Sequence, residues 1–180
     1  MPRADGSWMA PFRVKYRAWW PGAEPLIREH NYRDAFKTYP FPAFDTSPWA
    51  PLATPLERAT VALVTTAAMY RPGTDLPFAD EHLEGDVSFR AIPRDVDAAT
   101  LDVIHSHIPE QIPRADMNTV FPLWRLWELR RDGVVGDVAA THYSLLGYNT
   151  RAADVAEHMA PAIAALMKAE GVHLALIAPV

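Results

Sequence analysis

The chain has 180 residues, of which 49% are hydrophobic and 22% charged, a composition typical of one globular domain with a substantial core. Its net charge of -5 excludes the basic surface that nucleic-acid binding requires, and no apolar stretch is long enough to span a bilayer. The absence of cysteine excludes disulfides, thiolate-bound zinc and thiol catalysis within these residues. The N-terminus lacks a signal-peptide pattern, so we expect a cytoplasmic protein.

Residues 1–56 are predicted to form an irregular N-terminal arm, because they hold more than half of the 17 prolines and more than half of the aromatic residues. We expect one helix from about Pro25 to Lys37, since proline is tolerated in the first turn of a helix. The stretch from Tyr39 to Pro55 should be extended, because proline disfavours helix at its own position and the one before it. The favoured interpretation is an arm whose aromatic side chains pack on the main domain. A partner surface is the alternative.

Residues 57–180 are predicted to form an α/β domain. Apolar, β-branched runs predict strands at 61–66, 101–105, 142–147 and 172–178, the last of them buried. Helical periodicity predicts helices at 121–131 and 151–170, and Pro161 should kink the second helix or split it in two. Strands joined by helices at this spacing pair in parallel. The expected fold is therefore a small, mostly parallel Rossmann-like or flavodoxin-like sheet with flanking helices. No glycine-rich phosphate loop is present.

Polar residues follow several of the predicted strands. Thr66 follows the first strand, His105 and His107 follow the second, and Tyr148 follows the third. Because the carboxyl ends of parallel strands meet at one edge of a sheet, these side chains are candidates for a binding or catalytic site.

His105 and His107 are the strongest candidates for catalysis. Two residues apart in an extended chain, their imidazoles point to one side. This arrangement suits substrate binding or proton transfer, with metal ligation and an ordinary polar loop as alternatives. His142 is a candidate third member of the group. Spacing alone identifies no complete metal site.

A polar segment, Gly85 to Pro93, lies between the first two predicted strands. Within it Arg90 is a candidate for binding a substrate carboxylate by two hydrogen bonds, with Ser88 beside it. A surface ion pair with a neighbouring acid is the equally weighted alternative for Arg90.

Several blocks, taken in order, resemble the selenoprotein B family of glycine, sarcosine and betaine reductases, with D-proline reductase relatives. The resemblance covers roughly residues 40–180 and is carried by order and spacing more than by any single block. The blocks are Pro51 to Leu56, Val61 to Ala67, Gly85-Asp86-x-Ser88-Phe89-Arg90-x-Ile92-Pro93, His105-Ser106-His107, Asn118-x-Val120-Phe121-Pro122-x-x-Arg125-Leu126, Gly136-Asp137-x-Ala139-x-x-His142-Tyr143-Ser144-x-x-Gly147-Tyr148 and Leu176 to Val180.

The resemblance implies a reductase in which a selenolate or thiolate attacks the substrate, releases an amine or opens a ring, and is then reduced by a thiol donor. In such proteins the reactive selenocysteine or cysteine directly follows a Pro-Val pair like Pro179-Val180. Selenocysteine would thus be expected just after Val180, and this chain itself carries no cofactor. Three origins of the chain are compatible with this ending: translation up to a selenocysteine codon, an engineered truncation, or a short paralogue that has lost the chemistry.

The first functional hypothesis is accordingly a component-B-like reductase subunit that binds a small amino-acid or betaine-like substrate. Its expected partners are other subunits of a reductase complex, a thiol electron donor and further copies of itself, through an apolar sheet face. A metal-binding hydrolase or lyase that uses the histidines is the second hypothesis. A non-catalytic assembly module, whose aromatic arm docks on a partner, is the third.

Overall fold

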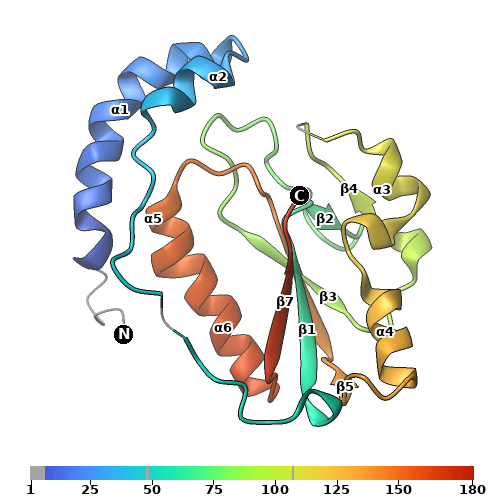
Figure 1. The fold of residues 1–180 in the computed structure, drawn as a ribbon. Helices are drawn as coiled ribbons and strands as arrows, with labels where there is room; N and C mark the ends of the chain where they lie inside the picture. Colours follow the sequence, from blue (N-terminus) through green and yellow to red (C-terminus); the bar gives the residue numbers. More distant parts are fainter. Residues whose placement is uncertain (1–6, 48, 107) are drawn as a thin grey trace.

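The fold is centred on strand β1 (Thr60–Thr65), whose apolar and β-branched side chains are buried. In the computed structural model, which describes residues 7–47, 49–106 and 108–180, β7 (Leu174–Ala178) pairs with one edge of β1 (Figure 1). Strands β5 (Asp137–Val138) and β6 (Thr141–Leu145) pair in succession with its other edge. All three pairings are parallel, and β3 (Phe89–Pro93) adds to β6 in the antiparallel direction. The prediction of an α/β fold with a mostly parallel sheet is confirmed.

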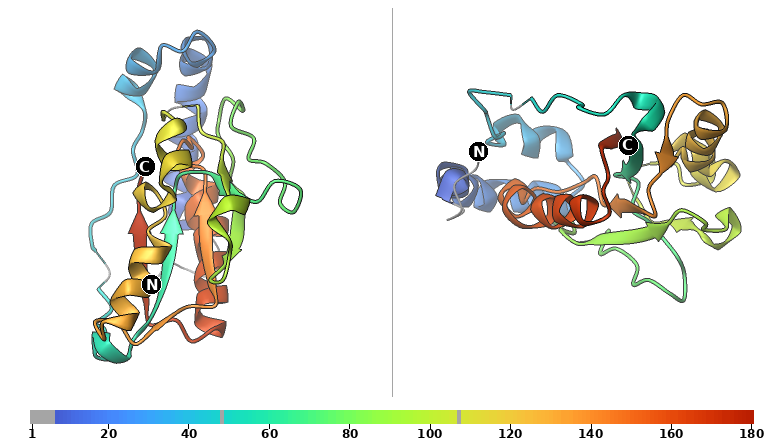
Figure 2. Two further views of the ribbon diagram at one scale, coloured as in Figure 1. Left: turned by 90° about the vertical axis from the view of Figure 1, so that its right-hand side faces the viewer. Right: turned by 90° about the horizontal axis from the view of Figure 1, so that it is seen from below.

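Helices cover the two faces of β1, as Figures 1 and 2 show. Val61 and Leu63 belong to the core under α4 (Leu123–Arg131). Ala62 and Val64 belong to the core under the second helical segment, which comprises α5 (Ala152–Asp154), a π turn (Val155–Met159) and α6 (Ala160–Ala169). This alternation follows from the two-residue period of a strand, and it explains why β1 is apolar from Val61 to Val64.

The helical segment predicted at 151–170 is present, and Pro161 neither splits nor ends it. Proline has no N–H to donate to the carbonyl four residues earlier. The backbone here widens into the π turn immediately before α6, with Pro161 in the first turn of that helix. Such a turn accommodates a locally missing hydrogen bond without breaking the helix.

The prediction that residues 101–105 form a strand of the main sheet is wrong. Only β4 (Asp102–Val103) is extended, and it pairs antiparallel with β2 (Met69–Tyr70) in a separate small sheet. The reason is that this segment buries one face alone, because Val103 is buried whereas Asp102 forms an ion pair with Arg114 of α3 (Gln111–Ala115). A central parallel strand has to be apolar on both faces.

The segment predicted as a polar patch contains the missed strand β3. It is an edge strand with one buried apolar side chain, Ile92, and it ends in Pro93. Proline is acceptable there because an edge strand has no second neighbour that needs its N–H.

The N-terminal arm is more helical than predicted, and the helix expected at 25–37 is wrong in position. Helix α1 (Ala10–Arg28) starts earlier, and after a turn the short α2 (Tyr32–Ala35) follows, capped by Asn31. Pro21 and Pro25 lie inside α1. The apolar stripe of this helix, which includes Trp19 and Ile27, packs against Tyr39 and Ala153. Tertiary packing of an amphipathic face can outweigh the local penalty of proline.

Beyond the arm helices, the described residues from Tyr39 to Pro55 form no helix or strand, as predicted. Phe41, Phe44 and Trp49 of this stretch are exposed, so they do not pack on the main domain as the favoured interpretation of the arm would have it. The aromatic residues that do pack there belong mainly to α1 and the turns after it.

The final strand was predicted to be buried, and this is wrong. Leu174, Leu176 and Ile177 of β7 are 38%, 45% and 62% exposed, although β7 pairs with β1 along its whole length. The core residues under α4 and α6 come from β1, β5 and β6, and none comes from β7. β7 therefore lies outside the part of the sheet that α4 and α6 cover.

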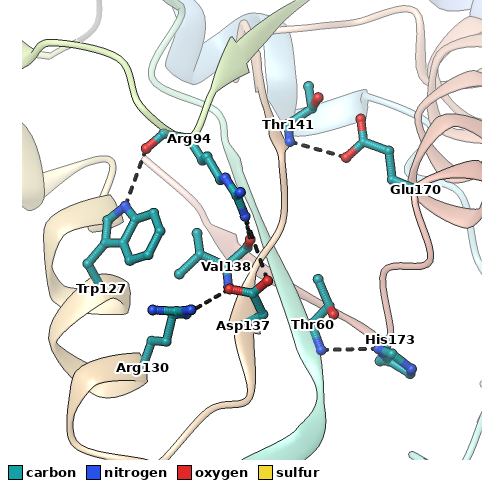
Figure 3. Close-up of polar contacts among 9 residues, drawn as sticks. All are labelled: Thr60, Arg94, Trp127, Arg130, Asp137, Val138, Thr141, Glu170 and His173. Carbon is teal, nitrogen blue, oxygen red and sulfur yellow. Dashed lines mark hydrogen bonds and ion pairs between the residues drawn. The ribbon is translucent and has the colours of Figure 1, made fainter.

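Polar contacts connect the amino ends of the strands to one another and to the neighbouring helices (Figure 3). The N–H of Thr60 donates to Nδ1 of His173 at 3.1 Å, and the N–H of Thr141 donates to Glu170. Asp137 accepts a hydrogen bond from Arg130 at 2.7 Å. These contacts satisfy groups at strand starts and fix β7 beside β1, at the opposite end of the sheet from the polar residues singled out above.

Candidate functional site

The carboxyl edge of the sheet is organised around Thr66, directly after β1. Its side-chain oxygen accepts the N–H of Val180 at 2.8 Å, and its own N–H donates to the carbonyl of Ala178. On its other side, the carbonyl of Thr66 accepts the N–H of Gly147 at 2.9 Å. A Cβ on Gly147 would lie 3.1 Å from that carbonyl, so glycine permits this close approach. Thr66 thus joins the ends of β1, β6 and β7.

A strained turn follows Thr66. Ala68 has φ of 53°, a left-handed conformation that residues with a side chain rarely adopt, and it is completely buried. It is held there because its N–H donates to Leu145 and its carbonyl accepts the N–H of Ile104. This turn brings the loop after β4, with His105, to the end of β1. Strain of this kind persists only where the surrounding structure imposes it.

We expect the Ala68→Gly substitution to stabilise the protein. Glycine adopts positive φ without the steric cost of about 1–2 kcal/mol, although the unfolded chain becomes more flexible. The expected net gain is up to about 1 kcal/mol in the free energy of unfolding, measured by urea denaturation. Ala67→Gly is the matched control, because Ala67 has no positive φ and should lose stability. A loss of stability in both variants would contradict the conclusion that Ala68 is strained.

His105 lies at this edge and is 3% exposed. Its backbone N–H donates to Glu110 at 2.8 Å, and the next N–H, of Ser106, donates to Asp80 at 2.8 Å. Asp80 is itself buried, with its second carboxylate oxygen not hydrogen-bonded within the structure. Sequence reasoning missed Asp80, because an isolated acid in a loop carries no pattern.

The predicted site residue His107 lies outside the described residues. Within the described ranges, no group of three or more His, Asp or Glu residues has the geometry of a metal site. Also within those ranges, no helix is sufficiently long and apolar to cross a membrane.

His142 lies in the interior and not at the edge. It is on β6, its Nδ1 accepts the N–H of Leu63 at 2.9 Å, and its ring meets Phe121 edge-on. The pairing with β1 is interrupted between Val138 of β5 and Tyr143 of β6, so the imidazole takes the place of a missing carbonyl acceptor. Burial lowers the pKa of His142 to about 4, and the nearby charge of Arg94 adds to this effect. Its geometry is that of a neutral structural acceptor, and its catalytic role stays a prediction.

Arg90 and Ser88 form a compact cluster with Asp86 at the start of β3. Arg90 donates to Ser88, to the carbonyl of Phe89 and to the carbonyls of residues 76 and 77, and it stacks on Phe78 at 4.1 Å. These bonds occupy four of the roughly five N–H groups of a guanidinium. The side chain therefore clamps the loop before β3, and carboxylate binding by Arg90 stays a prediction.

Ser88 and Asp86, the other two members of the cluster, are also held by hydrogen bonds. The Ser88 hydroxyl donates to Asp86 at 2.5 Å. Burial by itself would raise the pKa of Asp86, but hydrogen bonds from Ser88 and from the N–H of Ala79 outweigh it and lower that pKa.

Tyr148 connects this cluster to the arm. Its hydroxyl donates to the carbonyl of Leu83 at 2.8 Å, and its ring meets Tyr32 and Phe36 edge-on. Burial raises the pKa of Tyr148, so the phenol stays neutral. Beside it, Gly85 forms a bridge to Asn149 in a conformation with φ of 80°.

Of the predicted site residues, the structure thus places Thr66 and His105 at the carboxyl edge, next to the Val180 end of the chain. Ser88, Arg90 and Tyr148 fix the loop that supplies Asp80. His142 lies inside the sheet. The arrangement is a polar edge of the sheet with buried imidazole and carboxylate groups, His105 and Asp80.

Comparison with known proteins identifies the family. The family described as "Glycine/sarcosine/betaine reductase selenoprotein B" matches residues 22–179. The chain belongs to this family. The match therefore includes the end of α1, all of α2, the whole sheet and Pro179, whose two neighbours Ala178 and Val180 are hydrogen-bonded to Thr66.

Curated relatives agree with the family. The chain is similar to the D-proline reductase subunit gamma of Acetoanaerobium sticklandii, with 31% identity over 72% of this chain and 52% of the relative. It is also similar to two glycine reductase complex component B gamma subunits. That of Carboxydothermus hydrogenoformans is 29% identical over 98% of this chain and 41% of the relative, and that of Symbiobacterium thermophilum 27% identical over 73% and 31%. The chain thus spans about a third to a half of the length of these relatives. No solved structure matches it.

Proposed function

We propose that this selenoprotein B family chain is part of a reductase component that binds a small amino-acid or betaine-like substrate at the carboxyl edge of the sheet. The observation that carries the proposal is the family match over residues 22–179, which ends at the segment held by Thr66. The relatives are gamma subunits of reductases for glycine and D-proline, so substrates of that size and charge are the first to test.

In this proposal the nucleophile is a selenolate or thiolate located just after Val180, as the resemblance implies. It attacks the substrate carbon, the carbon–nitrogen bond breaks, and the amine leaves with that electron pair and a proton. Two thiols of an electron donor then reduce the adduct: the selenium–carbon or sulfur–carbon bond breaks, the carbon takes up a proton, the selenol or thiol is regenerated, and the donor becomes a disulfide. Thr66 sets the direction of the chain at Val180 through two hydrogen bonds. His105 and Asp80 supply polar groups beside it.

The same proposal includes the partners and the location. Other subunits of a reductase complex would complete the component, as the names of the relatives suggest for those proteins. Further copies of this chain are proposed as well, together with the cytoplasmic location expected from the sequence. The DNA after the Val180 codon tests the position of the nucleophile, since an in-frame UGA followed by open reading frame is expected.

We expect the purified chain to bind a substrate without turning it over. Glycine, sarcosine, betaine and D-proline would be titrated into the protein by calorimetry, and amine release or ring opening would be measured with a dithiol. At least one ligand should bind, and no product should form, because the chain has no thiol or selenol. The His105→Ala variant should bind that ligand roughly tenfold more weakly, as the loss of one hydrogen bond predicts.

His158→Ala is the matched control, because His158 is an exposed histidine on the helical segment remote from the edge. Equal affinities of the wild type and His105→Ala would refute the role of His105. Binding of none of the four ligands would refute the substrate site, and turnover by the purified chain would refute the placement of the nucleophile after Val180. Stoichiometric metal lost with His105→Ala would favour the metal-site hypothesis.

A further inference from the structure

A small cavity lies between the arm helix α1 and the start of the second helical segment, two elements that lie side by side (Figure 1). Helix α1 forms one wall, and Glu84 together with residues 151–154 forms the other. The volume is about 220 Å³, the space of roughly seven water molecules. Thr66, His105 and Asp80 do not line it, so the cavity is separate from the substrate site proposed above.

Two polar contacts join the walls of the cavity. The hydroxyl of Tyr16 donates to Oε1 of Glu84 at 2.6 Å. Burial raises the pKa of Tyr16, so this phenol stays a neutral donor. Arg13 forms ion pairs with Asp154 at 3.1 Å and with Glu157 at 2.7 Å. The charge of Arg13 is therefore already compensated, and this residue serves to hold α1 on the helical segment.

Three other charges at the cavity have no counter-ion within the described part of the chain. The side chain of Arg17 is exposed and makes no ion pair or hydrogen bond there. The side chain of Arg151 donates only to the carbonyl of Gly85, at 3.2 Å, and its Nε–H is buried and unpaired. Glu84 uses one carboxylate oxygen for Tyr16, and the other accepts no hydrogen bond from the described residues. Two guanidinium groups and a carboxylate thus line one cavity without pairing with one another.

Unpaired charges of both signs around one cavity favour a ligand that carries both. A simple anion would be attracted by Arg17 and Arg151 but repelled by Glu84, and a simple cation would meet the reverse. A zwitterion satisfies both walls, because its carboxylate accepts N–H groups from the guanidiniums and its ammonium donates to Glu84. The buried ring of Phe12 offers an apolar surface to the carbon atoms between the two charges. A volume below that of drug-sized pockets limits the ligand to a small molecule.

We propose that this cavity binds a small zwitterionic amino acid, which bridges the arm to the main domain. The bound ligand contacts α1 on one side and the turn after β6 on the other, so it holds the arm helix in place. Residues 12–17 of α1 lie outside the family match, which begins at residue 22. The site is therefore built by the arm of this chain together with the family segment, and it goes beyond the proposed reductase function.

Two-dimensional NMR of the 180-residue protein tests this inference by position. Glycine should shift the amide signals of residues 12–17, 84–85 and 151–154, and the titration gives the dissociation constant. Acetate and methylammonium, which each carry one of the two charges, should bind at least about tenfold more weakly. Betaine should also bind more weakly than glycine, because its quaternary ammonium has no N–H for Glu84.

Two substitutions test the two walls. Arg17→Gln should weaken glycine binding about tenfold, as the loss of one charge-assisted hydrogen bond predicts. Arg33→Gln is the matched control, because it removes the same charge from an exposed position of α2 that does not line the cavity. Both variants should fold, since both side chains are exposed. Glu84→Gln still accepts from Tyr16 but should reduce the preference for glycine over acetate, because the charge that attracts the ammonium is gone.

Three results would overturn the inference: no shift at these signals with glycine, acetate binding as tight as that of glycine, and equal affinities of Arg17→Gln and Arg33→Gln. The signals also separate this cavity from the substrate site. Shifts near Thr66 that His105→Ala removes report on the substrate site, and shifts at residues 12–17 that Arg17→Gln removes report on the cavity. Shifts confined to the carboxyl edge would refute the cavity and leave the substrate site standing. Shifts confined to the cavity would do the reverse.

Discussion

A Gly85→Ala variant is expected to lose most of its folding stability. Gly85 has φ of 80°, and a Cβ at this position would lie 2.2 Å from the carbonyl oxygen of Tyr148 and 2.9 Å from Cα of Asn149. Both contacts are with backbone, so no side-chain rotation can relieve them. The steric clash and the left-handed conformation together should reduce the free energy of unfolding by more than about 4 kcal/mol. Urea denaturation followed by circular dichroism measures this.

Gly73→Ala separates the two causes of that loss. Gly73 has nearly the same φ, 79°, but nothing lies within 4 Å of the position of its Cβ. It should therefore lose only about 1–2 kcal/mol, the cost of the left-handed conformation alone. Similar losses in both variants would contradict the role of the close approach between Gly85 and the end of β6. That approach places the loop with Asp80 and the Arg90 cluster against the carboxyl edge of the sheet.

The second large effect is a loss of stability below neutral pH that originates at His142. Its pKa is lowered to about 4 in the folded protein, against about 6.5 in the unfolded chain. Between these values the unfolded state binds a proton that the folded state excludes. The contribution of His142 is therefore complete above pH 6.5, declines as the pH falls, and is lost below about pH 4. The expected loss across this window is about 3 kcal/mol, at about 1.4 kcal/mol per pH unit.

The His142→Asn variant should remove this pH dependence. An asparagine oxygen can still accept the N–H of Leu63, whereas the side chain does not titrate, so its stability should change little between pH 6.5 and pH 4.5. Exposed His158, changed to Asn, should retain the wild-type slope. Urea denaturation at several pH values checks both. An unchanged slope in His142→Asn would show that another group, not His142, is responsible. Carboxyl groups with lowered pKa values, such as that of Asp75 beside Arg71, lose their contribution to stability only at more acidic pH.

The arm shows where local sequence rules were insufficient. Proline favours helix starts and disfavours interiors, so the sequence predicted a helix that begins at Pro25. In the structure Pro25 lies near the end of α1, because the stripe from Phe12 through Trp19 to Ile27 is buried against other parts of the chain. The stability that this burial gives to α1 depends on residues more than a hundred positions away in the sequence, such as Ala153. A local rule cannot include it.

In the candidate site, too, one position could be predicted from the sequence and another could not. Thr66 could be placed at the carboxyl edge from the sequence, because a run of apolar residues followed by a polar one defines both a strand and its end. His142 lies near the start of β6, and its ring lies between β1 and β6, where Nδ1 accepts the N–H of Leu63. It can lie there because the pairing with β1 is interrupted between β5 and β6. Only the register of the strands shows that this imidazole is an internal acceptor.

The sequence by itself determined the α/β class, the three parallel strands β1, β6 and β7, the two covering helices and the family, because periodicity and block order are properties of the chain. The tertiary structure alone decided which strands lie at the edges. Burial depends on what lies beside a strand, and β7, with the apolar composition of a central strand, pairs only with β1 among the described residues.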